Sequence, residues 1–243
     1  MKVKEIMTKD VISVDKDVDL RYVLKLMEKN DITKIPVLEE KELIGLITDN
    51  KIAYKLGSIR KKGVPPSRLH ASSVTDKNID CIKEDTDVKN ILKKVGKKGP
   101  TMLCITENKK LIGVITKADL LPLVTSKKQL KDIMKKNVYT VSPDDRVIHA
   151  RRIMIDNDIA RLPVVDKGEL VGIISDNEIM FSLADLKRHI RLGRQKHHLE
   201  KLLVRDTMKT PVIYTDQNKT VKQAAEIMIK ENGQTTISIP GAL

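Results

Sequence analysis

The stretch LIGLITDNK, at positions 43–51, is the strongest indication of the fold, because the chain contains it three times in related form. It returns as LIGVITKAD at positions 111–119 and as LVGIISDNE at positions 170–178. Each copy joins an apolar run rich in β-branched residues to a Thr or Ser and then to polar residues, which is typical of a buried strand that passes directly into a helix. This repetition predicts several copies of one structural unit.

The similarity continues upstream of each copy. Met7 lies 38 residues before Gly45, and Met134 lies 38 residues before Gly172. Between these anchors the features keep one order, since LMEKNDITKIPV before the first copy corresponds to IMIDNDIARLPV before the third. A looser second copy and the start of a fourth, RDTMKTPVIYTDQNKTVKQAAEIMIKEN at positions 205–232, follow the same order. The chain is therefore a tandem repeat.

Each unit has the pattern of a short strand, a helix with apolar residues at 3.6-residue spacing, two β-rich runs and a closing helix, which begins near Asn50 in the first copy. The predicted order is β-α-β-β-α, which makes the fold class α+β. A unit of roughly 55 residues is too small to bury its apolar faces well alone. We therefore expect the units to pack in pairs around a common core.

The composition of the 243 residues is that of a soluble globular protein, with 40% hydrophobic residues. The aromatic content of only 2% argues against stacking platforms for single-stranded nucleic acid. No apolar run is long enough to span a bilayer and no signal peptide precedes the first repeat, so we expect a cytoplasmic protein with no membrane contact. The net charge of +13 suits nucleic acid, an anionic membrane or a phosphorylated small molecule, and does not choose among them.

The reactive side chains indicate neither catalysis nor a metal site. Cys81 and Cys104 lack zinc-binding spacing and lie in apolar stretches, so both are expected to be buried free thiols. The sequence contains no Walker loop, HExxH or dinucleotide fingerprint and no Ser/His/Asp order, so we expect neither an enzyme nor a cofactor. No complete ligand set accompanies the five histidines, which are His70, His149, His189, His197 and His198.

The units resemble CBS domains, the small modules named after cystathionine β-synthase. The resemblance rests on a leading h-x-[TS]-V strand, an A/L-x-x-h-M helix, an IPV or LPV strand and a G-h-h-[TS]-x-x-[DE] ending, with h apolar, and it covers nearly the whole chain. It implies tandem CBS domains paired into two Bateman modules, a layout similar to the gamma subunit of AMP-activated kinase. The expected division is repeat one at 1–57, a basic linker at 58–68, repeat two at 69–125, repeat three at 126–186, a second basic linker at 187–202 and a truncated repeat four at 203–243.

The repeated ending carries the chemistry of interest. Its Thr or Ser lies where a strand becomes a helix, and the acid follows one turn later on the same side. Free N–H groups at a helix start suit phosphate or ribose oxygens, and a carboxylate can accept hydrogen bonds from both hydroxyls of a ribose. The same spacing is also a helix capping box, which needs no ligand. CBS domains of this form commonly bind adenosine ligands at these positions, which favours ligand binding here.

The three copies match this pattern unequally. Thr116 and Asp119 of repeat two provide the arrangement expected for a ribose diol. Repeat three has Ser175 and Glu178, whose longer carboxylate either binds ligand or only caps the helix. Repeat one has Thr48, but Lys51 takes the acidic position. Because lysine cannot accept from a ribose, that half-site is expected to prefer phosphate, another ligand or none.

Further candidates lie elsewhere in each repeat. Lys34 and Arg161 stand just before the IPV and LPV strands, where the resemblance implies phosphate contacts, although each could be an ordinary solvated cation. Met102 takes this place in repeat two, so we expect Lys34 to complement Asp119 across a shared cleft. The adenine is expected along the first strand of a repeat, through contacts that would equally serve a core. The candidate adenine contacts are Val11, Ile12, Asp80, Cys81, Val138 and Tyr139.

The fourth copy is incomplete. Thr215 corresponds to Val14, so the glycine of its ending would fall after Leu243. The stretch GQTTISIPGAL also places no proline where Pro36 and Pro163 predict one. Truncation, a frameshift and degeneration all explain this pattern. The second module is expected to lack a strand and a helix and to expose apolar surface.

These features and the resemblance together predict a regulatory protein that senses an adenosine-containing ligand, such as AMP, ADP, ATP, S-adenosylmethionine or another of this class. No effector domain is recognisable in the sequence, so a separate protein target is expected, together with a homodimer formed through the modules. The alternatives are a nucleic-acid-binding protein that uses the basic linkers and a scaffold for other proteins.

Overall fold

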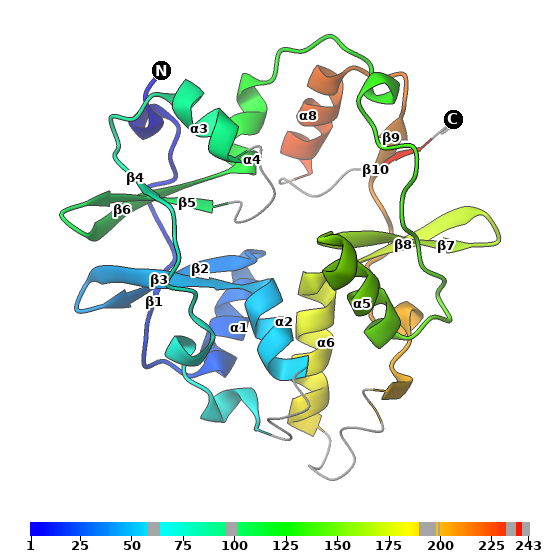
Figure 1. Cartoon of the computed structure of the whole chain (residues 1–243), viewed down its shortest axis with the longest axis horizontal. Coiled ribbons are helices and arrows are strands. Elements are labelled where there is room, and N and C mark those ends of the chain that lie inside the picture. The colour runs from blue at the N-terminus through cyan, green and yellow to red at the C-terminus, as the bar shows by residue number, and fades with distance from the viewer. Residues whose placement is uncertain (58–63, 96–101, 190–197, 199, 232–236, 240–243) are drawn as a thin grey trace.

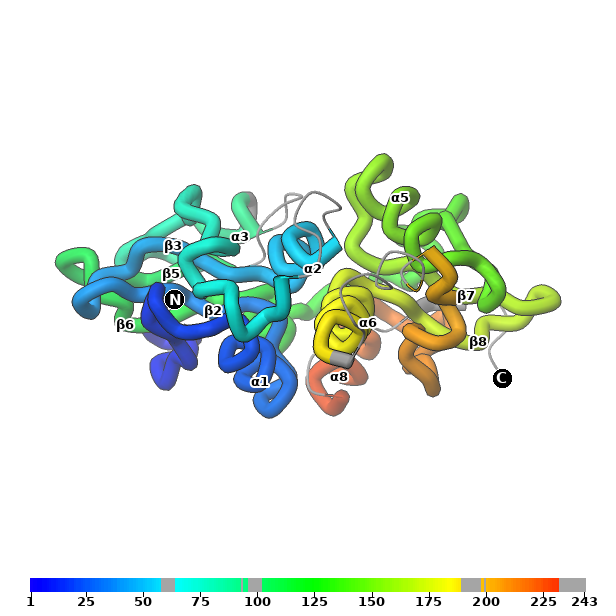
Figure 2. The backbone as a smooth tube through the Cα atoms, turned by 90° about the horizontal axis from the view of Figure 1, so that it is seen from below, coloured from blue at the N-terminus to red at the C-terminus, as the bar shows by residue number. Residues whose placement is uncertain are grey.

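The computed structural model describes residues 1–57, 64–95, 102–189, 198, 200–231 and 237–239. The molecule is flattened, and the four repeats occupy four quadrants around its centre (Figure 1). Repeats one and two lie in one half, and repeats three and four lie in the other, as the view from below also shows (Figure 2). The predicted α+β class is confirmed.

Repeat one has the predicted order of elements. The helix α1 begins where Asp19 accepts a hydrogen bond from the backbone N–H of Tyr22, and it ends at Asp31, which has left-handed geometry. A tight turn with positive φ at Glu40 and Lys41 joins the next two strands into a hairpin. The elements are β1 (Val14–Asp15), α1 (Leu20–Asn30), β2 (Lys34–Glu39), β3 (Glu42–Thr48) and α2 (Asp49–Gly57).

Repeats two and three follow the same plan with two local differences. The closing helix of repeat two has only four residues, and the first strand of repeat three is a single bridge between Val141 and Val164. The elements of repeat two are β4 (Cys81–Ile82), α3 (Val88–Val95), β5 (Met102–Glu107), β6 (Lys110–Thr116) and α4 (Lys117–Leu120). Those of repeat three are α5 (Val147–Asn157), β7 (Arg161–Asp166), β8 (Glu169–Ser175) and α6 (Asp176–His189).

Repeat four continues further than the sequence pattern suggests. It contains β9 (Tyr214–Asp216), α8 (Val221–Lys230) and β10 (Ile237–Ile239). The strands β9 and β10 are parallel, with Thr215 opposite Ser238, the same separation along the chain as between Val14 and Val37 in repeat one. The second strand therefore forms in register without the expected proline, because a parallel pair needs backbone partners and not that residue.

The first two repeats share one sheet. Its strand order is β1-β2-β3-β6-β5-β4, and the two halves meet where Glu42 of β3 pairs with Lys110 of β6. In the other half, β7 pairs with β8 and β9 pairs with β10 in two separate sheets. The pairing of repeats one and two into a module thus includes backbone hydrogen bonds, such as Leu43 N to Lys109 O at 3.0 Å.

The segment that opens each repeat packs on the partner repeat of its module. Four 3-10 turns show this exchange: η1 (Val3–Glu5), η4 (Ala71–Val74), η6 (Leu130–Asp132) and η7 (Val204–Asp206). The N–H of Val3 donates to Thr86 of repeat two, and the N–H of Ala71 donates to Val18 of repeat one. In the second module, Leu130 donates to Lys219 and Val204 donates to Asp145. Each repeat therefore completes its core with the opening segment of its neighbour.

The largest core joins the two modules. Buried apolar side chains of repeats one and three form one cluster, which includes Leu56 of α2 and Leu183 of α6. These two helices lie side by side (Figures 1 and 2). A smaller cluster around Ile91 and Ile105 fills repeat two. The expected packing within each pair is therefore present, since Val3 of repeat one is buried in the cluster of repeat two, and a core that crosses from one module to the other adds to it.

The two thiols differ from each other. Cys104 is buried, and this burial raises the pKa of its thiol to about 12. Cys81 is exposed, so the prediction that both are buried was wrong for this residue, because β4 is an edge strand of the sheet. Both are free cysteines. No helix in the described ranges combines the length and the apolar character that crossing a membrane requires.

Candidate functional site

The strand register brings the predicted cations next to the predicted hydroxyls. Lys34 lies opposite Thr48 in the β2–β3 hairpin, and Arg161 lies opposite Ser175 in the β7–β8 hairpin. Directly opposed residues of antiparallel strands have their Cβ atoms about 4.5–5.5 Å apart. Met102 faces Thr116 in the same way, so repeat two has a hydroxyl without a cation. The sequence predicted the members of each pair separately, and the register unites them.

The ending of repeat two forms a capping box. The backbone N–H and the hydroxyl of Thr116 donate to Asp119 Oδ2 at 2.6 and 2.7 Å. The hydroxyl of Thr8, from repeat one, donates to Asp119 Oδ1 at 3.2 Å. A carboxylate offers about four acceptor positions, so capping leaves capacity for a further donor. Helix α4 is too short for its dipole to contribute much, contrary to the expected helix-start contribution.

A pocket of about 440 Å³ adjoins Asp119. Its walls are apolar and come from repeats one, two and four, with the carboxylate as a polar group. The hollow is open to solvent and has a single polar side chain, so it is less enclosed than most small-molecule sites. Sequence reasoning missed the contribution of repeat four, which no local pattern indicates. The lining residues are Ile6, Ala118, Asp119, Leu121, Pro122, Leu123 and Ile229.

The ending of repeat three is capped in the same way. The N–H of buried Ser175 donates to Glu178 Oε2 at 2.9 Å, and the Ser175 hydroxyl also donates to that oxygen. Glu178 therefore reaches back to cap its own helix, and ligand binding by its carboxylate stays a prediction. The side-chain oxygen of the adjacent Asn177 is buried and has no hydrogen-bond partner within the described ranges.

The carboxylate at the ending of repeat one comes from the partner repeat. Lys51 contacts Asp76 with 3.0 Å between Nζ and Oδ2, and this hydrogen bond holds the pKa of Asp76 below its usual value. Asp76 bridges to Leu46 in the position where Thr8 bridges to Val114. The Lys51–Asp76 pair thus corresponds to the Asp119–Thr8 pair. In the first pair the carboxylate lies on the opening segment of the partner repeat, and in the second it lies on the closing helix. Asp76 could have been found in the sequence, because it lies six residues before Ile82, as Thr8 lies before Val14.

Cations from three repeats gather where the modules meet. Burial lowers the pKa of the half-buried Lys34, the nearby Asp49 opposes this effect, and Arg161 and Lys117 strengthen it. Lys34, Lys117 and Arg161 belong to repeats one, two and three respectively. Over the described ranges, no ion pair within 4 Å includes Lys34, Arg151 or Arg161. Cations in this state can accept an anion without first breaking an ion pair.

Two carboxylates lie in the same region, at the starts of α2 and α6. Burial raises the pKa of Asp49, and the charge of Lys34 opposes the shift. Burial also raises the pKa of Asp176, against a hydrogen bond of 2.9 Å that Asn50 Nδ2 donates across the module boundary. Burial lowers the pKa of Arg151, and Asp176 and Tyr54 oppose this shift. Sequence reasoning did not single out the two acids, because each follows a Thr or Ser as an ordinary first-turn residue.

The candidate adenine contacts are not core residues. Val11 and Ile12 are half-buried, whereas Val138 and Tyr139 are more than half exposed. Asp80 and Cys81 are exposed, and Asp80 Oδ1 lies 3.6 Å from Lys94 Nζ. Because Ile82 pairs as Val14 does, Ile79 and Asp80 are the positions equivalent to Val11 and Ile12, one residue before the predicted pair. An adenine contact at any of these positions stays a prediction.

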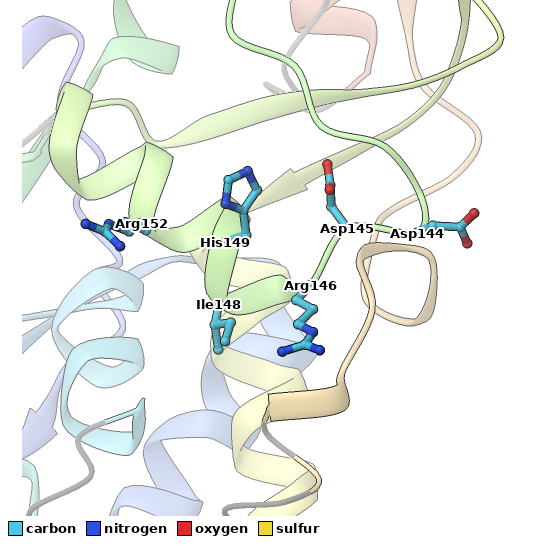
Figure 3. Close-up of a pocket in the computed structure, with 6 residues that line it drawn as sticks. All are labelled: Asp144, Asp145, Arg146, Ile148, His149 and Arg152. Carbon is cyan, nitrogen blue, oxygen red and sulfur yellow. The ribbon is translucent and has the colours of Figure 1, made fainter.

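A second hollow, of about 500 Å³, surrounds the start of α5. It is lined by Asp144, Asp145, Arg146, Ile148, His149 and Arg152, whose side chains point in different directions (Figure 3). Asp145 accepts from the Ser142 N–H, and Asp144 pairs with Arg205. Because its groups diverge or are already bonded, this hollow offers no convergent binding site.

The histidines form no metal centre in the described part of the chain. No group of three His, Cys, Asp or Glu side chains there could hold an ion. His70 Nδ1 lies 2.7 Å from the carbonyl oxygen of Asp17 and so has a structural hydrogen bond. His197, together with most of the second basic linker, lies outside the described residues.

Comparison with known proteins agrees with these features. The model of the CBS domain family matches residues 3–58, 71–126 and 130–185. The uncharacterised protein MJ1404 of Methanocaldococcus jannaschii is 31% identical over 243 residues, covering 93% of this chain, and the chain spans only 54% of that relative's length. MJ1225 of the same organism is 25% identical over 91% of this chain and 85% of its own.

Solved structures show the same fold. The crystal structure of MJ1225, described as a candidate archaeal homolog of g-AMPK, superposes with a TM-score of 0.81, 22% identity and coverage of 96% of this chain and 90% of that one. An uncharacterised conserved protein from Pyrococcus horikoshii gives a TM-score of 0.58 at 20% identity, covering 99% of this chain and 92% of its own.

Proposed function

This chain belongs to the CBS domain family, and we propose that it is a regulatory protein that binds an adenosine-containing ligand and signals its occupancy to a separate target. The observation that carries the proposal is that Lys34 and Arg161, each opposite a Thr or Ser, belong to different modules and yet lie close enough for the charge of Arg161 to lower the pKa of Lys34. A nucleotide needs cations for phosphate and acceptors for ribose, and these positions provide both. Neither the binding of phosphate nor the binding of ribose requires a catalytic group.

Each part of the proposed ligand is assigned to particular residues of the repeats. Asp119 and Glu178 accept hydrogen bonds from ribose hydroxyls, with Thr116 and Ser175 beside them. Lys34 and Arg161 contact phosphate oxygens. The adenine lies along the first strands, with Val11 and Ile12 as the half-buried candidates, through backbone and apolar contacts.

Signalling would act through the contact between modules. The α2–α6 pair begins at Asp49 and Asp176, next to the proposed phosphate contacts. A ligand that binds one arrangement of these helices more tightly than another shifts the population toward it, by as much as the two affinities differ. A homodimer and a cytoplasmic location remain predictions of the same proposal.

The first experiment is a thermal-shift screen of the purified chain with adenosine, AMP, ADP, ATP, S-adenosylmethionine and a short DNA duplex at low and moderate salt. A ligand at about 100 times its dissociation constant stabilises by roughly 2.7 kcal/mol, which is readily visible. Stabilisation by an adenosine compound that persists at moderate salt supports the proposal. Salt-sensitive stabilisation by duplex alone contradicts it and favours nucleic-acid binding.

Two substitutions then locate the ligand. Asp119→Ala is expected to weaken every adenosine compound, because the ribose is common to all of them. Arg161→Ala is expected to weaken AMP roughly tenfold or more relative to adenosine, because a charge-assisted bond to phosphate is lost. Lys25→Ala, at an exposed position on α1, is the matched control and should change neither affinity. Equal losses of AMP and adenosine in the Arg161 variant would exclude its phosphate role.

A further inference from the structure

Two acids at the module boundary are assigned no ligand contact in the proposed function. Asp49 and Asp176 occupy equivalent positions in repeats one and three, each just after the hydroxyl that ends the hairpin. Their backbone N–H groups donate to Thr33 and Ala160, the residues that precede Lys34 and Arg161. The fold therefore holds each acid beside a proposed phosphate contact.

The acids act on the same cations that would meet a phosphate. The largest opposing charge on Asp49 is Lys34, and Arg161 also acts on it. Asp176 is influenced by Arg151, Arg161 and Asp49. Over the described ranges, no carboxylate oxygen of Asp49 or Asp176 lies within 4 Å of a side-chain nitrogen of these cations, so they form no ion pair. The carboxylates consequently reduce the positive potential without locking the cations in place.

The net charge of the ionisable groups in this region is small. Four cations and three acids influence one another there: Lys34, Lys117, Arg151 and Arg161, with Asp49, Asp176 and Glu178. A single phosphate brings a charge of about −1.5 to −2 at neutral pH. The four cations exceed the three acids by one charge, so a single phosphate leaves an excess of at most about one negative charge. A triphosphate brings more negative charge into a half-buried region that already holds carboxylates, where repulsion is poorly screened.

We propose that Asp49 and Asp176 make this region selective for a ligand with one phosphate over a ligand with three. The inference rests on the proposed function for the presence of an adenosine ligand, and it adds the charge of that ligand and the residues that choose it. Repeat two supports the reasoning by contrast, because its equivalent position is Lys117, which adds a cation where the other two repeats place an acid.

The experiment measures dissociation constants by calorimetry for adenosine, AMP and ATP with the wild-type chain, Asp49→Asn, Asp176→Asn and the double variant. Asn keeps the shape and an acceptor oxygen for the N–H of Asn50, which donates to Asp49 Oδ1 at 2.9 Å. The wild type is expected to bind AMP more tightly than ATP. The double variant is expected to shift the AMP-to-ATP preference at least tenfold toward ATP, with adenosine unchanged. Asp166→Asn, at an exposed strand end, is the matched control.

A second pair of probes separates the two proposals. Inorganic phosphate and tripolyphosphate are measured with the same variants, because they contain no adenosine. If no adenosine compound binds but the double variant still shifts preference toward tripolyphosphate, the proposed function fails and the charge selection stands. If AMP binds and the preference is unchanged in both single variants and the double variant, the charge selection is overturned and the proposed function stands. Absence of binding by every anion overturns both.

Discussion

At the scale of single residues, the glycine of the repeated ending is explained by a neighbour from another repeat. A Cβ at Gly45 would lie 2.3 Å from Thr75 Cγ2 and 2.5 Å from the carbonyl oxygen of Asp76. The equivalent Gly113 and Gly172 meet the sulfur atoms of Met7 and Met208 at 2.7 and 2.5 Å. In each case the opening segment of the partner repeat crosses the strand at the glycine, so no side chain fits there.

We expect Gly45→Ala to lower the free energy of unfolding by about 1–3 kcal/mol, because the added methyl group meets a backbone oxygen that cannot move aside easily. Gly113→Ala should cost less, since its nearest neighbour is the flexible end of Met7. Urea unfolding of both variants measures the difference. A larger loss at Gly113 would contradict this account of the motif.

The buried acids predict a pH dependence of stability. Because burial raises the pKa of Asp176 above its unfolded value of about 3.9, the folded state favours the protonated form and the ionised form destabilises it. Asp176→Asn is therefore expected to be more stable than the wild type at pH 7. The difference should shrink as the pH falls through the raised pKa toward 4. Urea unfolding at several pH values tests this.

Asp76→Asn is the control with the opposite sign. The hydrogen bond from Lys51 lowers the pKa of Asp76 in the folded state, so its ionised form contributes stability above the unfolded pKa. This variant should be less stable than the wild type at pH 7, and the deficit should vanish as the pH falls through the lowered pKa. Parallel trends in the two variants would contradict both assignments.

At the scale of elements, the exchange of opening segments makes each repeat depend on its neighbour. Val3 precedes repeat one's first strand, yet it is fully buried in the core of repeat two with Ile91 and Leu103. Ala71 and Val74 are likewise part of the core that contains repeat one. The strands and helices form from local sequence, but their cores are completed from outside the repeat.

Val3→Ala is expected to cost about 2 kcal/mol, the value of two buried methylene-sized groups with some cavity formation. Hydrogen exchange should show the loss of protection in α3 and β5 rather than in α1 and β2. Val138→Ala, at a side chain 54% exposed, is the control and should change stability by no more than about 0.5 kcal/mol. Loss of protection confined to repeat one would refute the exchange.

At the scale of the whole molecule, the modules are joined by a core and not only by a linker. The helices α2 and α6 contribute Leu56 and Leu183 to one apolar cluster, and Asn50 bonds to Asp176 at the start of the same helix pair. The proposed phosphate contacts lie at that end. Ligand binding and the contact between modules therefore involve the same two helices.

Leu56→Ala should destabilise the protein by about 2–5 kcal/mol, because its side chain is only 1% exposed in this shared core. Amide protection should fall in α6 as well as in α2. Ile91→Ala, in the separate core of repeat two, should leave α6 protected at mild denaturant concentrations. Changes restricted to α2 after the Leu56 substitution would show that the two modules unfold independently.

Local sequence was enough to predict the repeats, the order of strands and helices in the first three, and the hydroxyl–acid pairs that end repeats two and three. These features arise from residues two to four positions apart, whose periodicity sets the local structure. Only the folded molecule shows that opening segments are exchanged, that Lys51 pairs with Asp76, that Arg161 of repeat three acts on Asp49, and that Asp176 accepts a hydrogen bond from Asn50 of repeat one. Four similar repeats present similar apolar faces, and a local pattern does not specify which face meets which. That choice depends on shape and charge across distant parts of the chain, and only the folded molecule brings them together.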